Sequence, residues 1–188
     1  MDKDIFLNLY KSIVRPHLEY ASAVWSLVFK KDKISIENVQ RRATRLVNSL
    51  KNLSYEQRMK ELGLPSLEYR RTRADMVQTF KILQDIDHVV KDKLFTMSTY
   101  TRTRGNSRKL FKRRSRLQTR ANVFSNRIVN AWNNLPETVV MAPSLNSFKS
   151  MLNTHWHNHP NKFTPLCYTT TDTLEIERPR TNASTEAM

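Results

Sequence analysis

The sequence predicts an all-α protein: an irregular helical bundle of about six helices with a basic loop or extended segment and a disordered carboxy-terminal tail. Apolar residues recur every three or four positions along most of residues 1–156, which is the spacing of one helix face. Alternating apolar and polar residues, which are typical of strands, are too few to support a sheet. Capping patterns and prolines mark where the helices begin and end.

The first predicted helices lie within residues 1–50. Ile5, Leu9 and Ile13 recur at helical spacing, and Pro16 lacks an amide donor, so we expect two short helices that meet at this proline. An amphipathic helix is predicted from about Asp32. Its expected apolar stripe comprises Ile36, Val39, Ala43, Leu46, Val47 and Leu50, with Arg41, Arg42 and Arg45 toward the other side.

Residues 51–98 predict a helical connector. Ser54 and Gln57 form a capping-box pattern for a short helix, and Gly63 supplies a left-handed cap at its end. A longer helix restarts at Ser66. The apolar residues spaced as its buried stripe are Tyr69, Met76, Phe80 and Leu83.

Residues 121–156 predict a helical pair that covers the core. The first helix ends at Pro136, and Ser144 is the expected N-cap of the second. Helical periodicity is lost from about His157, so we expect residues 157–188 to be a disordered tail. The three tryptophans lie on predicted apolar stripes, which favours core packing over base stacking; they are Trp25, Trp132 and Trp156.

The composition limits the classes of partner and site. A formal charge of +15 favours acidic partners, of which nucleic acid is the commonest and an anionic membrane surface is the rival. The single cysteine, Cys167, excludes an internal disulfide framework and points to a reducing compartment, nuclear or cytoplasmic. Without a neighbouring cation we expect this residue to be an ordinary exposed thiol.

No set of residues suits catalysis or metal binding. Asp85 and Asp87 lie at a predicted helix end, where acidic residues are common. The alternating histidines of "HWHNHP", residues 155–160, have no cysteine or carboxylate close in sequence. With only two glycines, the chain has no phosphate-cradling glycine loop. We therefore expect no catalytic residue, no metal and no cofactor.

Residues 99–120 are the most distinctive segment, because their basic residues have no acidic residue between Asp92 and Glu137. Such a cluster is self-repelling unless a polyanion occupies it, and arginine binds phosphate through two donors at once. Phe111 is the single aromatic residue between Arg102 and Arg120, which favours backbone contact over base stacking. "KRRSR" at 112–116 also fits a nuclear-import signal. The candidate nucleic-acid-binding residues are Arg102, Arg104, Arg108, Lys109, Lys112, Arg113, Arg114, Arg116 and Arg120, with Arg41, Arg42 and Arg45 as a weaker second patch.

Several segments also carry a resemblance to a known family. They are "LYKSIVRPHLEYASAVWS", "VQRRATRLV", "LSYEQRMKELGLPSLEYRRTRADMVQTFKIL", "TRGNSRKLFKRRSRLQTRANVFSNRIVNAWNNLP" and "APSLNSFKSMLNTHW". In this order, over roughly residues 4–156, they resemble the carboxy-terminal part of endonuclease–reverse transcriptases from non-LTR retrotransposons of the jockey-like group.

The resemblance implies a thumb and post-thumb region. Residues 4 to about 47 would belong to the thumb, which grips the template–primer duplex, and the basic segment would follow it. The family's palm carries a paired-aspartate metal motif, but this chain has no Asp-Asp dipeptide, so no catalytic residue carries over. Some related elements end in a cysteine-rich motif, which Cys167 alone cannot form.

Three functions remain open. The first is a non-catalytic fragment of an RNA-directed DNA polymerase that binds RNA, DNA or both through phosphates, with the missing palm domain as a possible partner. The second is a non-functional relic or a truncated gene model, with exposed apolar surface where the palm would pack. The third is a basic module that binds acidic proteins or lipid.

Overall fold

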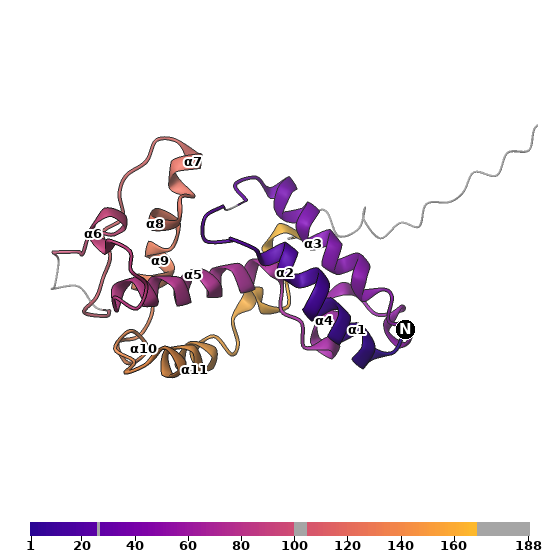
Figure 1. Ribbon diagram of the computed structural model, residues 1–188. Coiled ribbons are helices and arrows are strands. Elements are labelled where there is room, and N and C mark those ends of the chain that lie inside the picture. Colours follow the sequence, from indigo (N-terminus) through magenta and orange to yellow (C-terminus); the bar gives the residue numbers. More distant parts are fainter. Residues whose placement is uncertain (26, 100–104, 169–188) are drawn as a thin grey trace, which may run out of the picture.

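The structure, a computed structural model, describes residues 1–25, 27–99 and 105–168. Throughout these ranges it is helical and contains no strand, and a single isolated bridge joins Met97 to Leu110. The predicted all-α class is therefore confirmed. Figure 1 shows two groups of helices joined by α5 (Leu67–Leu83), which runs through the middle of the molecule.

The amino-terminal lobe begins with one helical rod. It consists of α1 (Lys3–Leu9), the π-helical turn η1 (Tyr10–Val14) and α2 (Arg15–Glu19). Val14 and Arg15 keep right-handed helical dihedrals, so the two helices expected to meet at Pro16 are continuous. Pro16 stands in the first turn of α2, where a missing amide hydrogen is tolerated, and π turns of this kind absorb local irregularity.

The next helices complete this lobe: α3 (Lys30–Thr44), the 3-10 turn η2 (Asn48–Leu50) and α4 (Tyr55–Leu62). The predicted capping box of α4 is present, since Ser54 Oγ accepts from the Gln57 amide at 3.3 Å and Gln57 Oε1 accepts from the Ser54 amide at 2.9 Å. Gly63 follows with a φ of 59°, the left-handed conformation that ends a helix.

The carboxy-terminal lobe packs short helices against α5. Ser144 caps its longest helix as predicted, by accepting from the Ser147 amide at 3.2 Å. The helix expected to end at Pro136 is divided at Ile128 into two. The elements are α6 (Lys91–Leu94), α7 (Gln118–Ala121), α8 (Phe124–Arg127), α9 (Val129–Asn133), α10 (Glu137–Val140) and α11 (Leu145–His155), followed by 3-10 turns at Pro160–Lys162 and Leu166–Tyr168.

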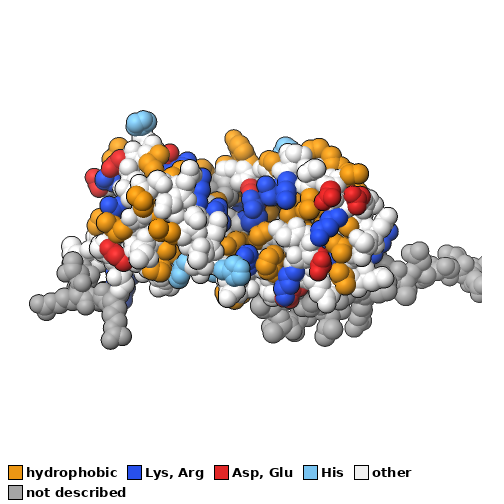
Figure 2. All heavy atoms as spheres, turned by 90° about the horizontal axis from the view of Figure 1, so that it is seen from below, with side chains coloured by type: hydrophobic (Ala, Val, Ile, Leu, Met, Phe, Trp, Pro, Cys, Tyr) orange, Lys and Arg blue, Asp and Glu red, His pale blue; other side chains and the backbone are white. Residues whose placement is uncertain are grey.

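Each lobe has its own apolar core. In the carboxy-terminal lobe, Phe80 stacks on Phe148 with ring centroids 4.3 Å apart, and Trp132 lies against Phe148. The smaller core of the other lobe includes Phe6 and Tyr10. Figure 2 shows the underside as two rounded halves, with basic side chains gathered near the middle. Trp132 and Trp156 are buried as predicted, but Trp25 is 37 % exposed, so its assignment to the core is wrong.

The buried face of α3 is polar. Glu37, Gln40, Arg41 and Thr44 are buried, whereas Val39 and Leu46, two members of the predicted apolar stripe, are exposed. The inward residues find polar partners: Tyr10 donates its hydroxyl to Gln40 Oε1 at 2.7 Å, and Tyr55 donates to Glu37 Oε1 at 2.6 Å. Because buried polar groups are stable only when hydrogen-bonded, these tyrosines set which face of α3 turns inward.

The chain remains packed beyond His157. Ser66, which caps α5, donates its amide to the Lys162 carbonyl at 2.8 Å and its hydroxyl to the Asn161 carbonyl at 2.7 Å. Cys167 is buried, and burial raises the pKa of its thiol to about 12. The expectation of a disordered tail is therefore wrong for residues 157–168, as is that of an exposed thiol. The remainder of the predicted tail lies outside the described residues.

Candidate nucleic-acid interface

Residues 105–111 of the basic segment are pinned to the carboxy-terminal core. Asn106 is buried and donates its side-chain amide to the carbonyls of Trp132 and Leu135, at 3.1 and 3.0 Å. Leu110 is buried too, and its backbone exchanges two hydrogen bonds of 2.9 Å with the side chain of Asn133. Residues 105–111 thus have a defined course along α9, despite their lack of helical periodicity.

Two further contacts fasten this stretch. Ser107 donates its amide and its hydroxyl to the Glu137 carboxylate, each at 2.6 Å, and these bonds, with the nearby Arg108 charge, lower the pKa of Glu137. The Arg108 carbonyl accepts from Trp132 Nε1 at 2.9 Å. Gly105 has a φ of 127°, a backbone conformation that residues with a side chain rarely adopt, so this position favours glycine.

Beyond the anchored stretch, the cationic side chains point to solvent. Lys112, Arg113, Arg114, Arg116 and Arg120 are exposed, whereas Arg108 and Lys109 are half-buried. Among the described residues, none of the five exposed cations forms an ion pair with a carboxylate. Arg113 donates to Thr96 Oγ1 at 3.2 Å. Arg102 and Arg104 lie outside the described residues.

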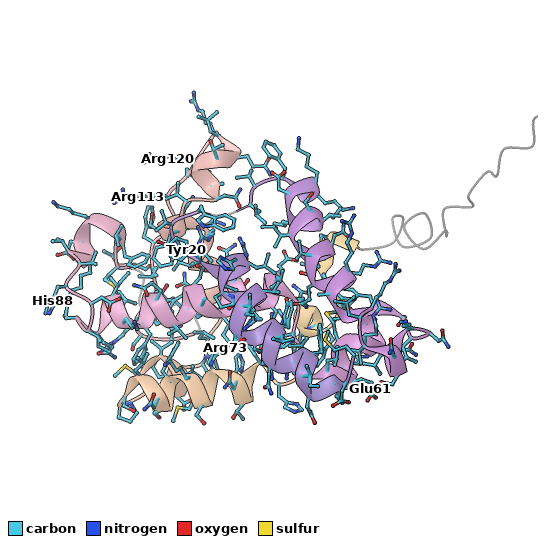
Figure 3. All side chains as sticks on the ribbon, turned by 45° about the vertical axis from the view of Figure 1, so that its right-hand side comes forward. Tyr20, Glu61, Arg73, His88, Arg113 and Arg120 are labelled. Atoms are coloured by element: carbon cyan, nitrogen blue, oxygen red, sulfur yellow. The ribbon has the colours of Figure 1, made fainter. Side chains whose placement is uncertain are left out.

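Two of the exposed cations, Arg113 and Arg120, share one side of the molecule. In Figure 3, Arg113 and Arg120 lie on the upper side, opposite α11. The first turn of α3 lies on the same side, as Figure 1 also shows. Lys30 and Lys31 belong to that turn, so positive charge flanks this side from two elements.

The second predicted patch is at the other end of α3. Arg42 and Arg45 are exposed there, but Arg41 is buried, and we leave it out of the interface. The structure does not bring this patch to the basic segment. Lys30 and Lys31, on the side of the basic segment, are at the amino-terminal end of α3, and Arg42 and Arg45 are at its carboxy-terminal end.

A cavity of about 210 Å³ lies where α3, α5 and α9 meet, and we call it the junction cavity. Sequence patterns did not single out its polar residues, which are far apart along the chain. Arg127 binds both carboxylate oxygens of Asp75, at 2.8 and 2.9 Å, and also donates to the Ser22 carbonyl at 2.9 Å. The charged residues that line the cavity are Lys33, Glu37, Glu68, Arg71, Asp75 and Arg127.

Burial shapes the titration of these groups. It raises the pKa of Glu37 to about 7, although hydrogen bonds from Tyr55 and from the Leu67 amide oppose the shift. It also raises the pKa of Asp75 against the pull of Arg127, and it lowers the pKa of Arg71. The Arg71 guanidinium carbon lies 4.2 Å from the centre of the Trp25 ring.

The other candidate residues have structural partners. Asp85 pairs with Lys91 at 2.7 Å, and Asp87 accepts from Gln78 at 2.6 Å. His159 packs edge-on against Tyr69, and burial lowers its pKa. Within the described part of the chain, no three His, Cys, Asp or Glu side chains gather as metal ligands would, and no helix is long and apolar enough to cross a membrane.

Comparison with known proteins found no matching family model, no similar curated protein and no similar solved structure.

Proposed function

We propose that this protein is a non-catalytic nucleic-acid-binding module that grips RNA or DNA through its phosphates. One observation carries the proposal: five exposed cations follow a backbone stretch that is fixed by buried contacts, and no described carboxylate neutralises them. A charged surface with this arrangement attracts a polyanion, and guanidinium groups suit phosphate geometry. The contacts would carry little sequence preference, because phosphates are common to every sequence.

The resemblance of residues 4–156 extends the proposal to a biological setting. In that reading the chain is the thumb and post-thumb part of a retrotransposon RNA-directed DNA polymerase and helps to hold template, primer or target DNA. The family assignment rests on the sequence segments alone. The all-α architecture is compatible with it.

A second candidate is a relic or truncated chain that has lost its packing partner, and one observation favours it. Ile5, Leu9 and Ile13 form an exposed row on α1 and η1, at 55, 46 and 57 % exposure. Phe6 and Tyr10 on the same rod face the core, so the rod is apolar on two sides. An exposed row of this kind is typical of a surface that another domain covers.

Fluorescence anisotropy of labelled duplex DNA, structured RNA and an RNA–DNA hybrid, measured across a salt series, tests the leading proposal. If about six phosphates are neutralised, the logarithmic salt slope on DNA is near −5. Changing Arg113, Arg114 and Arg116 to Gln is expected to flatten the slope by up to about three units.

The matched control changes Arg42, Arg45 and Lys51 to Gln, which removes the same charge at the carboxy-terminal end of α3 and after the turn η2. We expect this control to alter the slope by less than about one unit, because separate exposed charges are screened beyond a Debye length of about 8 Å. A shallow salt slope shared by all three proteins would contradict the proposal. The basic residues 112–116 would then be explained as a nuclear-import signal. Flotation with anionic vesicles, unaffected by competing nucleic acid, would instead favour the lipid-binding alternative.

A further inference from the structure

The junction cavity combines apolar walls with buried polar atoms. Its apolar residues include Leu27 from the loop before α3, Ile36 from α3, Met76 from α5 and Ile128 from α8–α9. Its volume of about 210 Å³ exceeds the roughly 30 Å³ share of one water molecule. It is below the roughly 300–1,000 Å³ of pockets that hold whole small-molecule ligands. A group the size of one planar heterocycle suits it.

Charged side chains of both signs line the cavity. The three basic side chains, Lys33, Arg71 and Arg127, face the three acidic ones, Glu37, Glu68 and Asp75. Arg127 and Asp75 satisfy each other, and Lys33 pairs with Glu68 Oε1 at 3.1 Å. An isolated phosphate or cation would gain no net attraction here and would lose its hydration, so a neutral polar group is the better occupant.

Two polar atoms at this wall have unused hydrogen-bonding capacity. Glu68 Oε2, an acceptor, and Arg71 Nε, a donor, are both buried and have no hydrogen-bond partner among the described residues. The two residues are three positions apart on α5, so they lie on the same face of the helix. The rest of the Arg71 guanidinium is held in place, because Nη2 donates to the Leu18 carbonyl at 2.7 Å and the group lies over Trp25.

We propose that the junction cavity receives one unpaired nucleobase of a bound nucleic acid. The Watson–Crick edge of every base presents a donor beside an acceptor, and Glu68 and Arg71 supply one acceptor and one donor from the same face of α5. Apolar walls on either side of a planar ring are the usual surroundings of a base taken out of its stack. This inference rests on the proposed nucleic-acid-binding function and adds recognition of a single-stranded or bulged position to it.

The cavity lies next to the proposed phosphate contacts. Asn122, which follows α7 directly, lines the cavity, and Arg120 is part of α7. Lys33, on the second turn of α3, lines it from the other side. A strand whose phosphates contact Arg120 therefore has a base within reach of the cavity. In this arrangement the phosphate contacts position the base, and the residues that line the cavity recognise it.

The test compares two labelled RNA duplexes by anisotropy at one salt concentration: one has a single bulged adenosine, and the other has an abasic residue at the bulge. Base stacking and edge contacts predict that the wild-type protein binds the adenosine duplex at least about fivefold more tightly. Thr72→Trp fills the cavity from α5 and is expected to remove this preference while the salt slope stays unchanged. Ala131→Leu adds a smaller side chain to the cavity from α9 and is expected to reduce the preference for the adenosine duplex.

Ala74→Trp is the matched control, since it adds the same bulk at an exposed position of α5 and is expected to keep both the preference and the slope. If the wild type binds the two duplexes equally and with a steep salt slope, the proposal that the cavity receives a base is wrong and the cavity holds only water. The phosphate-binding function would still stand. Preference retained by a folded Thr72→Trp protein would overturn it as well, because the base would then bind elsewhere. Absence of binding to either duplex at low salt would overturn the phosphate-binding function together with the pocket.

Discussion

Arg127 on α8 binds both carboxylate oxygens of Asp75 on α5, at 2.8 and 2.9 Å, and the Arg127 side chain also reaches the Ser22 and Ala23 carbonyls. These contacts join three segments that are separated by more than 50 positions along the chain. With side-chain exposures of 14 and 7 %, the pair is largely buried. Arg127 therefore links α5 and α8 of the carboxy-terminal lobe to the loop that follows α2, whereas each lobe also has an apolar core of its own.

Arg127→Met is expected to lower the free energy of unfolding by about 3–5 kcal/mol, because it leaves the Asp75 carboxylate buried and unpaired. Urea denaturation, followed by circular dichroism, measures this loss. The double variant Asp75→Leu/Arg127→Met is expected to recover part of it, since the uncompensated charge is then gone. A loss below about 1 kcal/mol in the single variant would show that solvent reaches the pair.

Glu37 makes stability depend on pH. Its pKa of about 7 in the folded protein lies above the ordinary glutamate value of 4.5, so the folded state holds the proton more tightly. The folded state then binds more protons than the unfolded state between these values, and the contribution of Glu37 to stability falls as pH rises from about 4.5 to about 7, by up to about 3 kcal/mol. It is fully present at lower pH and lost above pH 7.

Glu37→Gln tests this dependence, because glutamine does not titrate but keeps the shape of the side chain. The difference in unfolding free energy between wild type and Glu37→Gln, measured in urea from pH 4 to 8, isolates the residue from the other carboxylates and histidines. We expect the wild type to lose stability relative to the variant as pH rises through this window. A difference that does not change with pH would show that Glu37 titrates normally.

Trp132→Ala is expected to cost about 3–5 kcal/mol, because its fully buried ring packs against Phe148 in the larger core. Trp25→Ala is the comparison, since this half-exposed ring loses its contact with Arg71 and its hydrogen bond from Nε1 to the Tyr20 carbonyl, and the expected cost is about 1–2 kcal/mol. Urea midpoints of the two variants give the contrast. Similar costs would mean that the ring of Trp25 is as well packed as that of Trp132.

Asn106→Ala is expected to loosen the basic segment. The carbonyls of Trp132 and Leu135 lose their donor, at a cost of about 1–3 kcal/mol, and trypsin is expected to cleave within residues 112–116 sooner than in the wild type. Nucleic-acid affinity should fall with an unchanged salt slope, because the number of phosphate contacts stays the same while pre-organisation is lost. Asn130→Ala, at an exposed position of α9, is the control and should leave both readouts unchanged.

Sequence patterns predicted the helices whose signals are local. The capping box at Ser54, the left-handed Gly63 and the N-cap Ser144 are each read over a few neighbouring positions, and the structure has all three. The inward face of α5 followed from spacing in the same way, since Tyr69, Met76 and Phe80 are buried. The high positive charge of residues 108–120 was also evident from the sequence, because formal charge follows from residue type alone.

The sequence by itself determined the all-α class, several helix boundaries and the acid-free basic segment, because these depend on residues close together in the chain. The tertiary structure decided that Glu37 and Gln40 turn inward, since their partners Tyr10 and Tyr55 come from other helices. It likewise decided that Cys167 is buried and that Glu68 and Arg71 line a cavity. Burial and hydrogen-bond pairing are properties of contacts between distant segments, and no local pattern of residues specifies which segments will meet.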